Sequence, residues 1–238
     1  MSSFEPLKFF ATAPHPCSYF NDRDATTVFV EPDVDLRPDQ FIRLTESGFR
    51  RSGRYIYKPH CDQCSACISV RIPVDIFKPK RRQLRTKKHN NDVSFSVRDP
   101  ALDEERYDLY KRYINARHPS GDMFPPSPSQ YESFLASTRE HTFFLEARIG
   151  NRLIAVTLFD EIVGNSLSAI YSFFEPDSQF ERRSLGRMMV LQLIELTSNL
   201  GIPYLYLGYW IQDSKKMDYK TEYRPIEMLI NGRWIRAD

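Results

Sequence analysis

The chain has 238 residues, of which 41% are hydrophobic and 13% are aromatic, including 17 Phe and 13 Tyr. Disordered chains are poor in such residues, so this composition predicts a folded globular protein of one large domain or two small ones. The formal net charge is only +2, so a polyanionic partner has to be inferred from local clusters rather than from the field of the whole molecule.

The first 98 residues predict short strands joined by irregular connections. A short helix is expected over 38–48, where Pro38 starts it and Gly48 stops it. A second, basic helix is expected between the last two strands of this half. Strands are expected at 25–30, in a hairpin over 49–59, at 68–74 and at 92–97.

The pattern changes after Asp99-Pro100, where longer elements begin. Helices are expected over 101–118, over 127–137 and from Ser184 to a stop at Gly201. A closing hairpin turns at Asn231-Gly232. Strands are expected over 142–148, 153–160, 167–174 and 204–210.

The order of three strands, a turn, a helix and a strand is that of a GNAT-type N-acyltransferase core. We therefore predict an α+β fold with a GNAT-like domain over 99–238 and a smaller, cysteine-containing domain over 1–98. The turn over 181–188 carries Arg182, Arg183 and Arg187, and its backbone N–H groups at a helix N-terminus would suit an anion. Ser184 and Gly186 have an alternative explanation, since a plain N-cap and close packing need the same residues.

No basic segment followed by an apolar core opens the chain, and no apolar run reaches the ~20 residues of a membrane helix. We therefore expect a cytosolic protein without a membrane partner. Thiols stay reduced in the cytosol, where a group of cysteines is more often metal-binding or catalytic than a disulfide framework.

Three of the four cysteines, Cys61, Cys64 and Cys67, follow C-x₂-C-x₂-C spacing, and Cys17 is far from them in the sequence. Three close thiolates and a distant fourth match both zinc and four-iron cluster ligation. We therefore predict an iron–sulfur cluster or zinc on these four residues. The alternative is that they are free thiols in a small core.

The segment over 78–88 contains seven basic residues and no acidic residue. A face exposed only to water usually mixes the two signs of charge. We therefore predict contacts with a nucleic-acid backbone, the alternative being a solvated helix face. The candidate residues are Arg81, Arg82, Arg85, Lys87 and Lys88.

Seven ordered stretches together resemble the aminoacyl-tRNA–protein transferases, and specifically the bacterial aspartate/glutamate leucyltransferases of the R-transferase family. No single stretch would be specific for this family, but the seven stretches in this order are. The stretches are HPCSYF (15–20), GFRRSGRYIYKPHCDQCSAC (48–67), RHPSGDM (117–123), LSAIYSFFEP (167–176), RSLG (183–186), PYLYLGYWI (203–211) and SKKMDYK (214–220) followed by YRPIE (223–227).

The resemblance implies a reaction in which leucine passes from leucyl-tRNA to the free α-amine of a protein that begins with Asp or Glu. The product would be marked for N-degron proteolysis, and no ATP or nucleotide cofactor would be needed because the donor ester is already activated. The cysteines depart from the eukaryotic arginyl enzymes, which pair an early Cys-x-x-Cys with a later Cys-Cys. Here Phe20 occupies the position of the second cysteine of the early pair. The cluster chemistry of the arginyl enzymes therefore does not automatically apply to this chain.

An α-amine has a pKa near ~7.7–8.0, so a useful fraction is uncharged at neutral pH and no strong base is required. Positioning of the two substrates and stabilisation of the oxyanion should then contribute most to the rate, and no catalytic base is assigned. For the acceptor carboxylate, which needs a cation, the candidates are Arg50, Arg51, Arg71 and Arg117, with surface ion pairs as the alternative.

The leucine side chain needs an apolar pocket, for which Tyr209 and Trp210 are candidates unless they belong to the core. Lys216, with Lys215 and Lys220 near it, is expected at the carboxyl end of a strand. These ammonium groups could hold tRNA phosphates or the developing oxyanion.

Three other functions remain open from the sequence. The first is an acetyl-CoA-dependent N-acetyltransferase, although the turn over 183–188 lacks the final small residue of the usual acetyl-CoA loop. The second is an arginyl-tRNA–protein transferase. The third is a non-enzymatic metal-containing nucleic-acid adaptor, which would leave the acyltransferase core unused.

Overall fold

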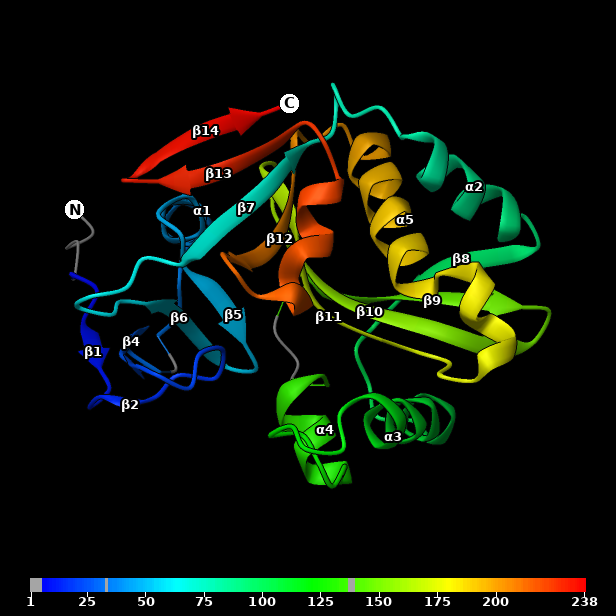
Figure 1. Ribbon diagram of the computed structural model, residues 1–238, viewed down its shortest axis with the longest axis horizontal. Coiled ribbons are helices and arrows are strands. Elements are labelled where there is room, and N and C mark those ends of the chain that lie inside the picture. The colour runs from blue at the N-terminus through cyan, green and yellow to red at the C-terminus, as the bar shows by residue number, and fades with distance from the viewer. Residues whose placement is uncertain (1–5, 33, 137–139) are drawn as a thin grey trace.

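The computed structural model describes residues 6–32, 34–136 and 140–238 (Figure 1). Its N-terminal part contains a four-stranded sheet in the order β1-β4-β6-β5, a short pair formed by β2 (His15–Pro16) and β3 (Asp24–Ala25), and helix α1 (Pro38–Glu46). The strands of the four-stranded sheet are β1 (Phe9–Ala11), β4 (Thr27–Val30), β5 (Arg50–Ser52) and β6 (Tyr55–Pro59).

An eight-stranded sheet forms the centre of the molecule, in the order β14-β13-β7-β12-β11-β10-β9-β8. β11 and β12 are parallel, whereas every other neighbouring pair in this sheet is antiparallel. The strands are β7 (Cys67–Pro73), β8 (Val93–Arg98), β9 (Thr142–Ile149), β10 (Arg152–Ile162), β11 (Ser166–Phe174), β12 (Tyr204–Ile211), β13 (Ile226–Ile230) and β14 (Arg233–Ala237).

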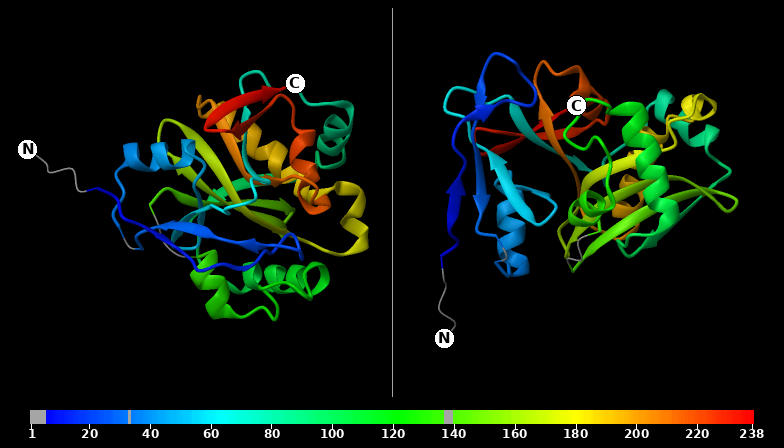
Figure 2. Two further views of the ribbon diagram at one scale, coloured as in Figure 1. Left: turned by 60° about the vertical axis from the view of Figure 1, so that its left-hand side comes forward. Right: turned by 90° about the horizontal axis from the view of Figure 1, so that it is seen from below.

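Helices cover both faces of this sheet, which accounts for its two hydrophobic clusters (Figures 1 and 2). α5 (Leu185–Asn199) packs on one face, with α2 (Arg81–His89) beside it. α3 (Glu104–Arg117) and α4 (Pro128–Phe134) lie on the other. Two 3₁₀ helices, η1 (Ser178–Arg183) and η2 (Lys215–Glu222), precede α5 and follow β12.

The predicted α+β class and GNAT-like core are confirmed. β9, β10 and β11 form a meander, and α5 crosses to a parallel β12. The sheet does not divide at residue 99, however, because β7 and β8 precede that position and belong to the large sheet. The apolar residues of β7 and β8 have to be buried, and they become buried when these strands join the large sheet. None of the helices in the described residues is long and apolar enough to span a membrane.

β12 loses its pairing with β11 near its middle and is irregular against β7 at the same place. Its parallel pairing with β11 covers only Tyr204–Tyr206, and its register against β7 shifts between Tyr206 and Tyr209. Gly208, in this interval, has φ +77°, a conformation that favours glycine. β11 and β12 therefore diverge toward their carboxyl ends, and α5 begins at the same edge because it follows β11 through η1.

Buried polar contacts attach the N-terminal sheet to the large sheet. Arg51 donates from Nε and Nη2 to the two carboxylate oxygens of Asp160, both at 2.7 Å, and the two side chains are 2% and 4% exposed. Thr142 donates to the same carboxylate at 2.7 Å. Tyr209 adds a hydrogen bond to the carbonyl of Gly48 at 2.6 Å. The hairpin of β5 and β6 is thus held against β10 and β12.

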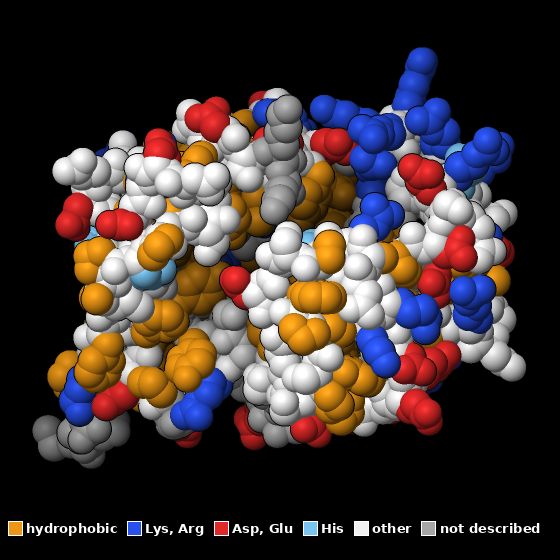
Figure 3. Space-filling model, turned by 60° about the horizontal axis from the view of Figure 1, so that its bottom comes forward, with side chains coloured by type: hydrophobic (Ala, Val, Ile, Leu, Met, Phe, Trp, Pro, Cys, Tyr) orange, Lys and Arg blue, Asp and Glu red, His pale blue; other side chains and the backbone are white. Residues whose placement is uncertain are grey.

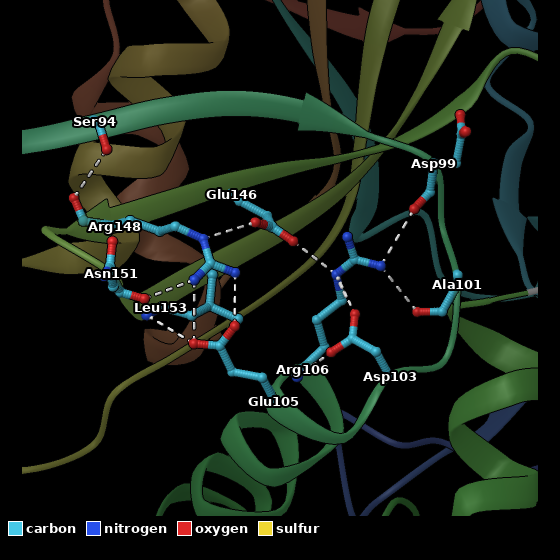
Figure 4. A network of polar contacts seen from close by, with 10 residues as sticks. All are labelled: Ser94, Asp99, Ala101, Asp103, Glu105, Arg106, Glu146, Arg148, Asn151 and Leu153. Carbon is cyan, nitrogen blue, oxygen red and sulfur yellow. Dashed lines mark hydrogen bonds and ion pairs between the residues drawn. The ribbon is translucent and has the colours of Figure 1, made fainter.

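A second network attaches α3 to the sheet (Figure 4). The carboxylate of Glu146 in β9 is 3% exposed and accepts from Arg106 at 2.7 Å and from Arg148 at 3.1 Å. Arg148 continues to Glu105 at 2.7 Å, and the Arg148 guanidinium holds the pKa of Glu105 below its ordinary value. Asp103 caps α3 by accepting from the backbone N–H of Arg106.

We predict that Asp160→Asn lowers the free energy of unfolding by about 3–5 kcal/mol, because it leaves the buried Arg51 guanidinium without a counter-charge. Urea unfolding at neutral pH measures the difference. Asp39→Asn is the matched control, since Asp39 pairs with Arg37 and Arg43 at the surface and the change should cost less than about 1 kcal/mol. Equal losses in the two variants would contradict the structural role of the pair.

Candidate active site

A cavity of about 270 Å³ lies between α2 and the beginning of α5, and arginines dominate its lining. The basic run and the turn before α5, which were separate features in the sequence, therefore meet at one place. Figure 3 shows Lys and Arg side chains gathered on the side of the molecule where Figure 1 places α2. The lining residues are Arg82, Arg85, Thr86, His89, Arg182, Ser184 and Arg187.

α2 reaches this position through hydrogen bonds to backbone carbonyls of η1 and η2. Asn90, which ends α2, donates to the carbonyl of Arg183 at 2.8 Å. Gln83, 2% exposed, donates to the carbonyl of Glu222 at 3.3 Å. These contacts bury the polar inner face of α2 and leave its arginines and lysines exposed to solvent.

Glu222 lies at the edge of the cavity and was not singled out from the sequence. Its two carboxylate oxygens contact Arg82 at 3.2 Å and Arg187 at 2.8 Å. The Nε of Arg187 is buried without a hydrogen-bond partner among the described residues. A single carboxylate therefore offsets two of the four arginines, and an anion entering the cavity would compete with it. No local pattern around Glu222 in the sequence points to this contact.

The structure separates the predicted tRNA-binding residues into two groups. Arg82, Arg85 and Ser184 line the cavity, whereas Arg81 and Lys88 are exposed on α2 outside it.

Contacts within the fold involve the other predicted tRNA-binding residues and make them less available for binding phosphate. Arg183 pairs with Asp92 through two bonds of 2.7 and 2.8 Å, which also hold the pKa of Asp92 below its ordinary value. Lys87 pairs with Glu195 at 2.6 Å. A Cβ on Gly186 would lie 3.1 Å from the ring of Phe174, so close packing explains this glycine.

Ser184, by contrast, does not fit the plain N-cap explanation. Its φ is +51°, and its side chain makes no capping hydrogen bond to α5. The hydroxyl instead belongs to the cavity lining.

Three of the four arginines predicted to bind the acceptor carboxylate are buried and have partners in the fold, so that prediction does not fit them. Arg51 is the partner of Asp160. Arg71 pairs with Glu227 at 2.7 Å and stacks between the rings of Tyr204 and Trp234.

Arg50 donates to the carbonyl of Thr45 at 2.9 Å, to that of Phe49 at 2.5 Å and to the hydroxyl of Ser69. Its guanidinium also lies 4.5 Å from the ring centroid of Tyr206. A guanidinium cannot leave water without such partners, and the partners occupy the donors that an acceptor substrate would need.

Arg117, the fourth, is exposed at the end of α3 and makes no hydrogen bond or ion pair with the residues that the structure describes. Its charge lowers the pKa of Tyr113, although burial raises that pKa more strongly. The Tyr113 ring contacts that of His118 with 5.3 Å between centroids.

A hollow opens between the N-terminal part and the α3–α4 side of the molecule, and hydrophobic side chains line its floor (Figure 3). Tyr219 in η2 is 45% exposed. Burial raises the pKa of its hydroxyl to about 12, and Tyr113 and Tyr19 contribute to that rise. Phenols from three distant segments thus lie near one another.

Lys220 lies where β12 loses its regular pairing. The residue is 6% exposed, and its Nζ donates to the carbonyl of Tyr209 at 2.5 Å. A Cβ on Gly208 would lie 3.6 Å from the same Nζ, an ordinary contact distance, so the amine lies close to the Gly208 backbone. Burial, assisted by the nearby Arg50 charge, lowers the pKa of Lys220 to about 8.

The other residues predicted to bind substrate, Tyr209, Trp210 and Lys216, differ in their surroundings. The hydroxyl of Tyr209 is committed to the Gly48 and Tyr57 carbonyls, so Tyr209 joins the N-terminal sheet to β12. Trp210 is half-buried, and its indole N–H has no partner among the described residues. Lys216 follows β12 in η2 as expected, but its side chain lies outside the described residues.

The four cysteines are free and half-buried. Burial, with smaller contributions from the thiols of Cys61, Cys17 and Cys64, raises the pKa of Cys67 to about 12. Cys61 accepts from the backbone N–H of Thr26 at 3.5 Å. Across the described residues, no three or more His, Cys, Asp or Glu side chains are placed to hold a metal ion. The sulfurs therefore gather in one region but do not form a ligand set as they stand.

One solved structure resembles the whole fold. It is described as the C-terminal domain of a "Putative Lysylphosphatidylglycerol Synthetase" from Agrobacterium fabrum, with a TM-score of 0.50 and 9% sequence identity. The match covers 88% of this chain and 79% of that one. At this identity the likeness concerns the fold alone.

Relatives in sequence cover the chain from end to end. A Pseudomonas fluorescens protein named Aspartate/glutamate leucyltransferase is 48% identical over 235 residues, which is 99% of each chain. A Hahella chejuensis protein of the same name is 47% identical over the same shares. The models for the N and C termini of arginine-tRNA-protein transferases match residues 15–85 and 105–230. The chain therefore belongs to the arginine-tRNA-protein transferase family of aminoacyltransferases, together with these leucyltransferase relatives.

Proposed function

We propose that this enzyme transfers leucine from leucyl-tRNA to the N-terminal α-amine of proteins that begin with Asp or Glu, which marks them for N-degron proteolysis in the cytosol. The observation that carries the proposal is the arginine-lined cavity at the start of α5, beside the diverging ends of β11 and β12. The phosphates of an aminoacylated tRNA would bind in the arginine-lined cavity. Its ester carbonyl would lie beside the diverging ends of β11 and β12.

The cavity suits phosphate because guanidinium groups from α2, η1 and α5 surround it. Arg82 and Arg85 approach from α2, and Arg182 and Arg187 from the other side. Such forks bind phosphate oxygens in pairs, and the backbone N–H groups at a helix N-terminus favour the same charge. These features support contact with the sugar–phosphate backbone rather than with bases.

The charges beside β12 support leucine rather than arginine as the transferred residue. Burial lowers the pKa of Lys220, the positive charge of nearby Arg50 lowers it further, and none of the described carboxylates makes an ion pair with Lys220. A guanidinium side chain entering this region would meet like charge without a counter-ion. A leucyl side chain avoids that cost.

The acceptor carboxylate fits Arg117 best among the four predicted arginines. Arg117 is the one exposed to solvent, and its charge acts on the neighbouring Tyr113. An Asp or Glu side chain reaching Arg117 would form a charge-assisted hydrogen bond, whereas Asn or Gln would not.

We derive no step through a metal. The prediction of zinc or an iron–sulfur cluster on Cys17, Cys61, Cys64 and Cys67 stays a proposal. Metal analysis of protein purified without oxygen tests it.

We predict that Asp and Glu peptides are better acceptors than Asn peptides by about 10- to 150-fold in kcat/KM, since a hydrogen bond to a charged group is worth about 1.5–3 kcal/mol. Initial rates are measured with leucyl-, arginyl- and phenylalanyl-tRNA against peptides that start with Asp, Glu, Asn, Ala or Arg. Preference for arginyl-tRNA would assign the chain to the arginyl branch. Acetyl transfer from acetyl-CoA, without transfer from any tRNA, would overturn the proposal.

Arg117→Gln should reduce the Asp-to-Asn preference toward unity, because it removes the cation and leaves the Asn reaction nearly unchanged. Arg112→Gln is the matched control on the same helix, since Arg112 is exposed and pairs with Glu175 at 3.0 Å. A preserved Asp preference in the Arg117 variant would show that another cation binds the acceptor.

We also predict opposite effects on tRNA affinity from the two signs of charge at the cavity. Arg82→Gln or Arg85→Gln should weaken binding and lower the slope of log affinity against log salt by about 0.7–0.9 for each phosphate that the variant no longer neutralises. Glu222→Gln should strengthen binding, because it releases Arg82 and Arg187. Filter binding at several salt concentrations measures both, with Lys8→Gln as a surface control of equal charge. Weaker binding by the Glu222 variant would contradict a phosphate site here.

A further inference from the structure

We propose that Lys220 is a catalytic residue that carries the proton during transfer: its uncharged amine accepts a proton from the attacking α-amine and returns it to the departing ribose oxygen. This inference rests on the proposed function and deepens it, since the reaction otherwise has no assigned proton carrier.

The geometry places the Lys220 amine at the point where β12 loses its regular pairing. Its Nζ contacts the Tyr209 carbonyl at 2.5 Å and faces the backbone of Gly208. Ligands in sheets of this kind bind beyond the carboxyl ends of parallel strands, where those strands diverge. Donor ester and acceptor amine would therefore meet beside this nitrogen.

The surroundings keep the amine available in its uncharged form. β12 contributes the Tyr209 carbonyl, β5 contributes the positive charge of Arg50, and η2 contributes the ring of Tyr219, 5.9 Å from Nζ. No carboxylate among the described residues pairs with Lys220, so desolvation is not offset and the pKa falls to about 8. A lysine with this pKa can both accept and release a proton near neutral pH.

The same short helix connects Lys220 to the arginine-lined cavity. Glu222, two residues later in η2, pairs with Arg82 and Arg187 at the cavity edge. Two residues of chain span at most about 7 Å. The backbones of these two residues are therefore close, and η2 links the edge of the proposed phosphate site to Lys220.

The proton count closes without another reactant. As the acceptor nitrogen bonds to the leucyl carbonyl carbon, its surplus proton passes to Lys220, which becomes an ammonium. As the bond from that carbon to the ribose oxygen breaks, the ammonium returns the proton to the oxygen. The products are a peptide bond, a ribose hydroxyl and an uncharged Lys220.

The test uses the full-length protein with leucyl-tRNA and an Asp peptide under single-turnover conditions. Lys220→Ala should slow formation of leucyl-peptide by about 10²–10⁴-fold, the usual contribution of general acid–base catalysis. Lys220→Arg should be as slow, because it keeps the charge but cannot give up a proton. Lys58→Met is the control, since the Lys58 ammonium also donates to a carbonyl, that of Ser47 at 2.8 Å, but from the surface.

A pH profile alone does not separate Lys220 from the acceptor, because the α-amine titrates near the same pH. The decisive measurement is rescue of Lys220→Ala by methylamine and by amines of lower pKa. Leucyl-peptide formation should rise with the concentration of free-base amine, and the rescue rate should depend on the pKa of the added amine. A structural role for the side chain would not produce this dependence.

Three outcomes would overturn the inference: an unchanged rate in Lys220→Ala, a wild-type rate in Lys220→Arg, or no rescue by any amine in a variant that still binds leucyl-tRNA. The first two would mean that the amine is not needed or that its charge suffices. Failure of the wild-type protein to transfer leucine would instead overturn the proposed function itself, so the two failures are distinguishable.

Discussion

Burial of three guanidinium groups is the constraint on which the rest of the structure depends. Arg50, Arg51 and Arg71 leave water only because distant segments supply their partners, among them Asp160 in β10 and Glu227 in β13. An unpaired charge in such a place would cost about 3–5 kcal/mol, a large share of the roughly 5–15 kcal/mol that stabilises a folded domain. The N-terminal hairpin must therefore dock on the large sheet in one orientation, and that docking closes one side of the hollow.

In the proposed reaction, two kinds of cation serve two different steps. The arginines of α2 and α5 stay in contact with water, where they keep their charge and can exchange one carboxylate, Glu222, for phosphates. Lys220 is withdrawn from water and has no counter-ion among the described residues, so its amine can lose its proton. Arginine could not replace it, because its pKa stays too high for proton transfer. The short η2 helix joins these two environments.

The sequence predicted most elements of the fold, and particular residues show why the site was harder. Helix and strand periods are local, so α5 and the meander of β9 to β11 were expected close to their observed bounds. The basic run and the turn before α5 were both predicted to bind anions. Arg51 and Arg71 pair with carboxylates of the fold. The sequence does not reveal these pairs, because an arginine in a matched motif looks the same whether it binds a substrate or a carboxylate of its own fold.

By itself the sequence determined the acyltransferase-like order of elements, the family and the presence of two cationic segments, because each depends on neighbouring residues or on ordered motifs. Only the tertiary structure decided that these segments line one cavity, that Glu222 partly neutralises it, and that β7 and β8 belong to the large sheet. It also decided that Lys220 is buried and has a lowered pKa. Burial and pairing arise between residues far apart in the chain, and no local pattern encodes which of them meet.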